Sequence, residues 1–288
     1  MVHPAARADA SGMTGFPFAQ VDVFATRPLS GNPLAVVSDA DALTGEDMQR
    51  IANWTNLSET TFLLAPATPG ADYRVRIFTP EKELPFAGHP TLGTCHTWLL
   101  AHPGHAGDTV VQECGAGLVT LRKSDGGRLA FAAPPLLRDE PADDAVQDEL
   151  ADVLGIDRAD VLEARWVDNG PGWVAVRLAS ADAVLALTPR VSDYEIGVVG
   201  PYPPGSPHAV EVRAFFPTAG SLTEDPVTGS LNAGLAQWLL GTGFLAAPYV
   251  ASQGTALGRA GEVHVTQEDG DIWVGGTSTT RVTGTLTL

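Results

Sequence analysis

A histidine between glycines is the residue of this sequence whose type and position most suggest chemistry. The segment KELPFAGHPTLGTCHTWLL, residues 82–100, places His89 directly after Gly88, at the start of an apolar stretch typical of a helix. The first N–H groups of a helix lack intrahelical partners, and the helix dipole favours anions there. These groups discourage protonation of His89, which makes it a candidate proton donor or acceptor. The bare Gly88 backbone would let a substrate carboxylate approach closely.

The same pattern occurs again about half a chain later. The segments RIFTPEKELPFAGHPTLG, residues 76–93, and RAFFPTAGSLTEDPVTGSLNAG, residues 213–234, share seven ordered identities. Three of the matched pairs are 137 residues apart and four are 141 residues apart. Four residues inserted in the second copy account for this difference. The matched pairs are Arg76 and Arg213, Phe78 and Phe215, Pro80 and Pro217, Glu83 and Glu224, Pro85 and Pro226, Gly88 and Gly229, and Gly93 and Gly234. We infer a duplicated unit.

The two copies differ at the positions that could do chemistry. Ser230 follows Gly229 where His89 follows Gly88, and Asp225 takes the place of Leu84. The paired glycines are expected to face one cleft between the halves and to bind a ligand through backbone N–H groups. Ser230 alone is more typical of a helix N-cap than of a nucleophile, because no G-x-S-x-G elbow surrounds it.

Glu59 is the remaining acid candidate. It lies in NWTNLSETTFLLA, at the start of a strand-like run. A single glutamate has no signature of its own, so the pattern alone favours a solvated strand end.

Alternating and β-branched runs outnumber helical patterns in both halves. The expected strands are AQVDVFA, LAVVS, ETTFLLA, YRVRIF and TVVQE in the first half, and WVAVRL, AVEVRAFF and EVHVTQ in the second. LTGEDMQRIANW and VQDELADVLG predict a further helix per half, the first opening at Thr44 with Asp47 three residues on, close to a capping box. The sequence therefore predicts an α+β protein of two pseudo-symmetric halves, each a curved, mostly antiparallel sheet around one central helix. The expected domains are residues 15–126 and 127–278, with 1–14 a flexible tail and 279–288 completing the first half.

Composition excludes several classes of partner. The chain has 288 residues, 44% of them apolar, and a formal net charge of −17, which repels nucleic acid and anionic lipid. No run approaches the roughly 20 apolar residues that span a bilayer, and the first residues lack the apolar core of a secretory signal, so we expect a cytoplasmic protein. Cys95 and Cys114 are expected to be buried free thiols. The spacing of His96, His102 and His105 fits no metal site, and we expect no metal.

The segments GNPLAVV, NLSETTFL, FTPEKELPFAGHPTLG, QECGAGLV and EDPVTGSLNAG together resemble the PhzF-like family of phenazine biosynthesis. The resemblance runs from about residue 17 to about residue 265 and implies a diaminopimelate epimerase-type fold. It implies Glu59 as general acid/base, His89, Asp225 and Ser230 as its site partners, and substrate contacts from the backbone amides of Gly88 and Gly229.

The implied activity is a cofactor-independent isomerisation of a small carboxylate by a homodimer. A carboxyl group has an ordinary pKa of about 4.3, so a dry cleft must raise the pKa of Glu59 for it to act as a base. Related epimerases of this fold carry a cysteine at each helix start, where this sequence is expected to have Ala87 and Pro226. Two-thiol racemisation is therefore disfavoured. Two alternatives stay open: an epimerase of an amino-acid-like substrate using Glu59 with His89, and a small-molecule-binding protein without catalysis.

Overall fold

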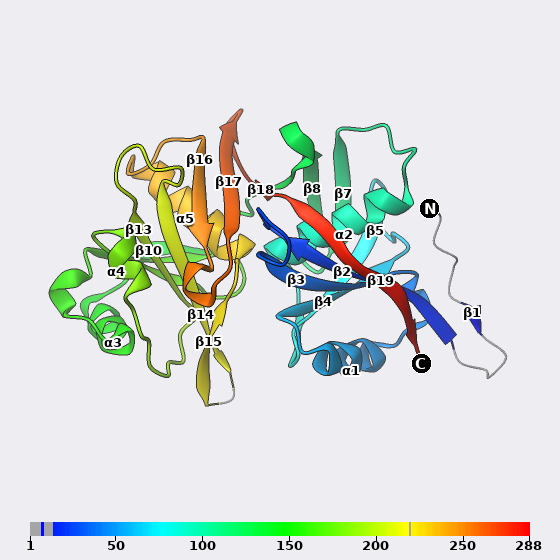
Figure 1. Cartoon of the computed structure of the whole chain (residues 1–288), viewed down its shortest axis with the longest axis horizontal. Helices are drawn as coiled ribbons and strands as arrows, with labels where there is room; N and C mark the ends of the chain where they lie inside the picture. The colour runs from blue at the N-terminus through cyan, green and yellow to red at the C-terminus, as the bar shows by residue number, and fades with distance from the viewer. Residues whose placement is uncertain (1–6, 9–13, 219) are drawn as a thin grey trace. The chain divides into compact units, whose positions relative to one another are not determined.

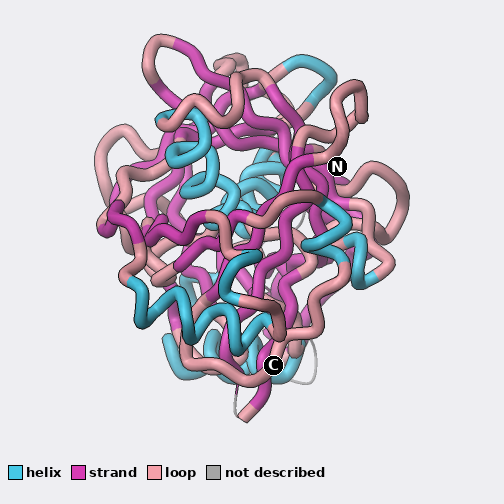
Figure 2. The backbone as a smooth tube through the Cα atoms, turned by 90° about the vertical axis from the view of Figure 1, so that its left-hand side faces the viewer, coloured by secondary structure: helices cyan, strands magenta, loops and turns pink. Residues whose placement is uncertain are grey.

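The computed structural model of the chain describes residues 7–8, 14–218 and 220–288. The tail expected at residues 1–14 lies outside the described residues, except for Arg7, Ala8 and Thr14. The chain divides into two compact units. The colour in Figure 1 follows the residue number, from blue at the N-terminus to red at the C-terminus. Unit 1 comprises Met1–Ala132 and Gly275–Leu288, and unit 2 comprises Ala133–Val274. Strands account for much of both units (Figure 2).

The elements of unit 1 are β1 (Arg7–Ala8), β2 (Thr14–Val23), β3 (Asn32–Val37), α1 (Gly45–Thr55), β4 (Glu59–Leu64), β5 (Tyr73–Phe78), β6 (Glu83–Leu84), α2 (Gly88–Ala101), β7 (Thr109–Cys114), β8 (Gly117–Lys123), β9 (Leu129–Ala132) and β19 (Ser278–Thr287). Those of unit 2 are β10 (Arg138–Pro141), α3 (Asp144–Leu154), β11 (Glu163–Asp168), β12 (Val174–Arg177), α4 (Ala181–Leu185), β13 (Ile196–Pro201), β14 (Val210–Thr218), β15 (Ser221–Asp225), α5 (Gly229–Gly241), β16 (Tyr249–Gln253), β17 (Gly261–Glu268) and β18 (Asp271–Gly276), whose last residues belong to unit 1. Short 3₁₀ turns lie at Ala40–Ala42, Asp125–Gly127, Arg158–Asp160 and Thr255–Leu257.

The two units have the same strand topology. In unit 1, β2 pairs antiparallel with β3, β3 parallel with β4, β4 antiparallel with β5, β5 parallel with β7, and β7 antiparallel with β8. In unit 2, the strands β11, β12, β13, β14, β16 and β17 repeat this series in the same order. A further antiparallel strand flanks each series, β19 beside β2 and β10 beside β11. The duplication inferred from seven identities is therefore a duplication of topology.

The predicted elements are present in the structure. Each predicted strand segment overlaps an observed strand, and YRVRIF coincides with β5. The capping box is confirmed, since Thr44 and Asp47 exchange side-chain to backbone hydrogen bonds at the start of α1. The counterpart of α1 in the repeat, between β12 and β13, is the short α4; the helix predicted from VQDELADVLG is α3, which lies between β10 and β11.

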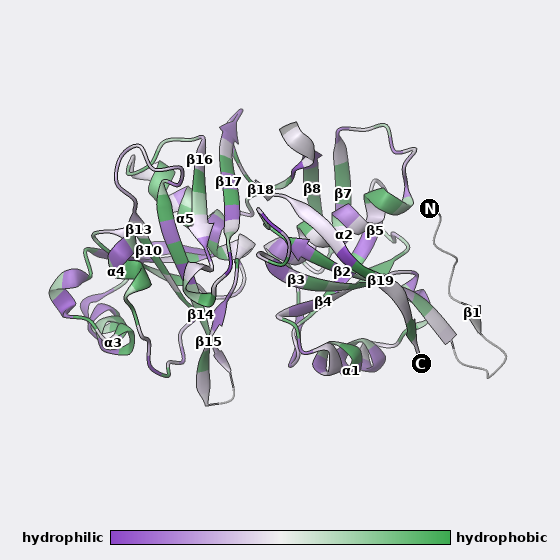
Figure 3. Ribbon diagram, viewed as in Figure 1, coloured by the Kyte–Doolittle hydropathy of each residue, from purple (hydrophilic) through white to green (hydrophobic). Residues whose placement is uncertain are grey.

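The sheet of unit 1 carries a helix on each face. α1 has hydrophilic and hydrophobic residues along its length (Figure 3) and buries Met48 and Ile51 in a cluster with Phe62 of β4. Side chains alternate along a strand, so Glu59 and Thr61 lie on the opposite face from Phe62. That face meets α2, because Thr94 donates to the Thr61 hydroxyl at 2.8 Å. The alternation of β4 thus directs Glu59 towards the side of α2.

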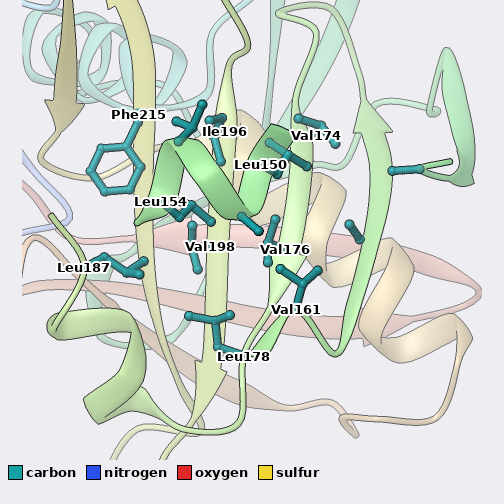
Figure 4. Packing of buried hydrophobic residues seen from close by; sticks show 14 of the residues in the cluster. Leu150, Leu154, Val161, Val174, Val176, Leu178, Leu187, Ile196, Val198 and Phe215 are labelled. Atoms are coloured by element: carbon teal, nitrogen blue, oxygen red, sulfur yellow. The ribbon is translucent and has the colours of Figure 1, made fainter. Parts of the chain in front are cut away.

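Unit 2 repeats this two-faced packing. On one face, α3 and α4 close an apolar cluster with the sheet, in which Leu150 and Leu154 pack near Val198 and Phe215 (Figure 4). On the other face, α5 packs closely on the strands: a Cβ atom on Gly234 would lie 2.4 Å from the Val167 carbonyl oxygen. The backbone of α5 is thereby held directly against β11.

This close approach gives a first prediction. Gly234→Ala forces the helix away from a backbone oxygen that cannot rotate aside, so we expect it to destabilise the protein by about 1–3 kcal/mol. A Cβ atom on Gly241, at the end of the same helix, would contact nothing within 4 Å. Gly241→Ala should therefore be neutral or stabilise slightly. Urea unfolding of both variants measures the difference, and equal stability of the two would contradict this account of the packing.

Candidate active site

Unit 1 brings together two of the predicted catalytic residues. Glu59 begins β4, and His89 is the second residue of α2. The His89 Nε2 and Glu59 Oε2 atoms lie 3.4 Å apart, with the two side chains 3% and 15% exposed. The two atoms are close enough for an ion-pair contact, but they do not form a hydrogen bond with each other. The acid candidate that had no signature in the sequence therefore lies next to the histidine that had one.

Asn32, at the start of β3, determines which nitrogen of His89 carries the proton. Its Nδ2 atom lies 3.3 Å from His89 Nδ1. An amide nitrogen only donates, so we assign Nδ1 as acceptor and Nε2 as the protonated nitrogen that faces Glu59. Burial lowers the pKa of His89 to about 3. The cause is the removal of the ring from water, which disfavours the charged form, so the imidazole is neutral near pH 7.

The loop before Asn32 is held by Asp22, at the end of β2. The Asp22 carboxylate accepts hydrogen bonds from the N–H groups of Leu29 and Gly31, at 2.7 and 2.8 Å. Arg281 of β19 also reaches this carboxylate, at 3.3 Å. The C-terminal strand therefore helps to fix the loop that presents Asn32 to His89.

Asp225 ends β15 in unit 2 and is buried. Its Oδ2 atom accepts a hydrogen bond from the Thr228 hydroxyl at 2.5 Å. The strand register confirms that Asp225 takes the place of Leu84, because Asp225 pairs with Ala214 as Leu84 pairs with Ile77. The aspartate is thus an acidic group that only the second copy of the repeat carries at this position.

Ser230, the second residue of α5, is held by two side chains from the β11–β12 loop. Trp173 Nε1 donates to Ser230 Oγ at 3.0 Å, and Asn169 Nδ2 donates to the Ser230 carbonyl oxygen at 2.8 Å. An indole N–H can only donate, so Ser230 Oγ accepts there and its own hydrogen is directed elsewhere. The Asn169 Oδ1 atom is buried without a hydrogen-bond partner among the described residues. Ser230 therefore keeps its hydroxyl hydrogen as a donor, and Asn169 keeps an unused acceptor beside it.

Neither helix start is capped by a side chain of its N-cap residue. α2 begins at Gly88 and α5 at Gly229. One expectation is wrong: the residue before the second helix is Thr228, and Pro226 lies two residues further back. Pro226 matches Pro85, so the true counterpart of Ala87 is Thr228. Neither position holds a cysteine.

The cysteines and histidines elsewhere take no part in this arrangement. Cys95 and Cys114 are both free and buried, as predicted. Within residues 14–218 and 220–288, no three His, Cys, Asp or Glu side chains are grouped so that they could hold a metal ion. In the same part of the chain, no helix is long and apolar enough to cross a membrane.

Sequence reasoning did not assign roles to several residues that contact His89, Asp225 or Ser230. Asn32 follows Gly31 in the segment GNPLAVV, and a polar residue beside a glycine was a usable signal of a functional position. Trp173 and Asn169 are 57 and 61 residues from Ser230 along the chain, and no local pattern connects them. Thr228 lies in EDPVTGS, where it reads as an ordinary turn residue.

Known proteins are similar to this chain in both sequence and fold. The family described as "Phenazine biosynthesis-like protein" matches residues 21–285. "Antisense-enhancing sequence 1" of Schizosaccharomyces pombe is 36% identical, over 94% of this chain and 99% of its own length. A trans-2,3-dihydro-3-hydroxyanthranilate isomerase of Pseudomonas fluorescens is 37% identical, over 83% of this chain and 86% of its own. The crystal structure of a PhzF family protein from Enterococcus faecalis has a TM-score of 0.78 at 26% identity and covers 95% of this chain and 100% of that chain.

The repeated topology, with a buried helix in each unit, is the diaminopimelate epimerase-type fold, and the named relatives make the protein an isomerase. The chain belongs to the PhzF family of phenazine biosynthesis-like proteins.

Proposed function

We propose that the protein isomerises a small carboxylate substrate without a cofactor, with Glu59 as the group that moves the proton. Glu59 takes a proton from a carbon whose C–H bond is activated by an adjacent π system. The bonding electrons shift into that system, and Glu59 returns the proton to another carbon of the same molecule. Bonds and electrons balance within the substrate, so no oxidant or reductant is needed.

The observation that carries this proposal is the pairing of Glu59 with a neutral histidine. The His89 Nε2 atom lies 3.4 Å from Glu59 Oε2, and Asn32 contacts the other ring nitrogen. The ring nitrogen that carries the proton faces Glu59, so the carboxyl group that would take the substrate proton lies beside a residue that can exchange one with it. His89 would also donate to the substrate once Glu59 has been protonated.

The other predicted residues are proposed to hold the substrate. Asp225 would bind an amine or hydroxyl group, and Ser230 would donate to an oxygen, since Trp173 already donates to it. The backbone N–H groups at Gly88 and Gly229 would receive the substrate carboxylate. Asn169 Oδ1 offers an acceptor beside Ser230, which suits a substrate that carries a donor as well as a carboxylate.

The substrate of the Pseudomonas fluorescens relative is the natural first probe, because it combines a carboxylate, an amine and a hydroxyl group on a diene ring. We expect the purified protein to convert trans-2,3-dihydro-3-hydroxyanthranilate, or to be stabilised by it in a melting assay, since a ligand stabilises the native state by mass action. The reaction is followed by absorbance and NMR in buffer containing a metal chelator. Inversion at a single carbon, found with amino-acid-like probes, would assign the protein as an epimerase. Binding without turnover of any probe would contradict catalysis.

A further inference from the structure

Gln253, at the end of β16, lies behind Asp225 with no exposed surface. Its Oε1 atom accepts hydrogen bonds from the Thr228 N–H at 3.0 Å and from Asn232 Nδ2 at 2.8 Å. Its Nε2 atom donates to the Asp225 carbonyl oxygen at 3.2 Å and to Thr228 Oγ1 at 2.9 Å. All the hydrogen-bonding capacity of this amide is therefore used on the segment between β15 and α5 and on the first turns of α5.

The backbone fixes the orientation of the Gln253 amide. The Thr228 N–H can only donate, and the Asp225 carbonyl oxygen can only accept. The amide oxygen must therefore face Thr228 N, and the amide nitrogen must face Asp225 O. A flipped amide would place its nitrogen against the Thr228 N–H, donor against donor, and its oxygen against the Asp225 carbonyl oxygen, acceptor against acceptor.

This orientation determines the direction of the next hydrogen bond. Gln253 Nε2 donates to Thr228 Oγ1, so the Thr228 hydroxyl hydrogen is available for Asp225 Oδ2, 2.5 Å away. An O–H···O distance in this range is typical of a hydrogen bond to a charged acceptor. The chain from Gln253 to Thr228 to Asp225 thus runs in one direction and ends on a carboxylate.

The first copy of the repeat has no such chain. Comparing the β5–β7 pairing of unit 1 with the β14–β16 pairing of unit 2 shows that Cys114 occupies the position of Gln253. The registers of the β5–β6 and β14–β15 hairpins show in the same way that Leu84 occupies the position of Asp225. The residue before the helix is Ala87 in unit 1 and Thr228 in unit 2. Three positions that are apolar or weakly polar in unit 1 are therefore all polar in unit 2, and the three polar residues contact one another.

We propose that Gln253 is a positioning residue that acts through Thr228 to keep Asp225 ionised and correctly oriented for a donor group of the substrate. Gln253 itself touches no substrate in this scheme. The inference rests on the proposed function, which assigns Asp225 to substrate binding. It adds the device that holds Asp225 as an acceptor, which is the hydrogen-bond chain from Gln253 through Thr228.

The test is a titration of Asp225 itself, which needs no substrate. Protein labelled with ¹³C at the aspartate carboxyl carbon is titrated by NMR, and the Asp225 signal is identified by its loss in Asp225→Asn. Thr228→Val keeps the branched shape but removes the hydroxyl that donates to the carboxylate, so Asp225 should titrate about one pH unit higher or more. Thr228→Ser keeps the hydroxyl and should restore the wild-type titration. An unchanged titration in Thr228→Val would overturn the proposal.

Gln253→Met provides a second variant, and it serves alone if Thr228→Val does not fold. It removes the donor that orients the Thr228 hydroxyl, so the titration of Asp225 should again move upward, by a smaller amount. A purely structural role for Gln253 would lower the melting temperature without moving this titration, and that result would overturn the part assigned to Gln253.

Turnover separates this inference from the proposed function. With a substrate in hand, the acidic limb of the kcat/KM profile should move upward in Thr228→Val together with the NMR titration. If Asp225→Asn keeps wild-type turnover while the titration still shifts in Thr228→Val, the hydrogen-bond chain is supported and the assignment of Asp225 to the substrate is overturned.

Discussion

Glu59→Gln should abolish turnover while leaving the protein folded and able to bind its ligand. Glutamine keeps the shape of the side chain and its contact with His89 but cannot carry a proton. Loss of a positioned acid or base typically costs about 10²–10⁴ in rate. We therefore expect kcat to fall by at least about 10², with the melting temperature and ligand affinity nearly unchanged.

Glu81→Gln is the matched control for this substitution. Glu81 lies in the same unit and is exposed in the turn between β5 and β6. Its replacement should leave kcat, affinity and melting temperature at their wild-type values. A Glu59→Gln enzyme that retains more than about a tenth of wild-type kcat would move the proton-carrying role to His89.

Asp225→Asn and His89→Asn should weaken both binding and rate. Asp225 is a buried acceptor fixed by Thr228, and a hydrogen bond to a charged group contributes about 1.5–3 kcal/mol. Asparagine removes that charge, so kcat/KM should fall by about 10²-fold, with KM and kcat both affected. His89→Asn removes the neutral donor that faces Glu59, with a similar combined effect.

The split between kcat and KM distinguishes these variants from Glu59→Gln. Steady-state kinetics of the three variants side by side should show a change in kcat alone for Glu59→Gln and in both parameters for the other two. If Asp225→Asn lowers kcat while KM and ligand affinity stay at wild-type values, the substrate-holding role of Asp225 is wrong.

The sequence predicted the repeated fold well because its signals are local. The alternation in YRVRIF corresponds to β5, and the Thr44 and Asp47 pair forms the capping box of α1. The spaced glycines and prolines located both buried helices to within one residue of Gly88 and Gly229. Local hydrogen bonds and side-chain periodicity decide such features, so a single sequence contains the information for them.

The surroundings of the site could not be predicted in the same way. Glu59 comes near His89 only because β3 and β4 pair in parallel and alternation turns Glu59 towards α2. Gln253 reaches Thr228 across 25 residues of chain, and nothing in YVASQG marks it as a partner. Such contacts depend on how distant strands pair, whereas the resemblance to a known family supplied Glu59 directly.

The most direct test of the account follows the proton itself. A substrate carrying deuterium on the C–H bond that breaks is mixed with excess enzyme, quenched within a single turnover and analysed by NMR. With the wild-type enzyme, the account predicts that the deuterium leaves its original carbon and that part of it appears on the accepting carbon, because one carboxyl group carries it. With Glu59→Gln, the substrate should remain unchanged on this timescale. Product that keeps its deuterium on the original carbon, or conversion by Glu59→Gln at a rate within tenfold of wild type, would contradict the claim that Glu59 carries the proton.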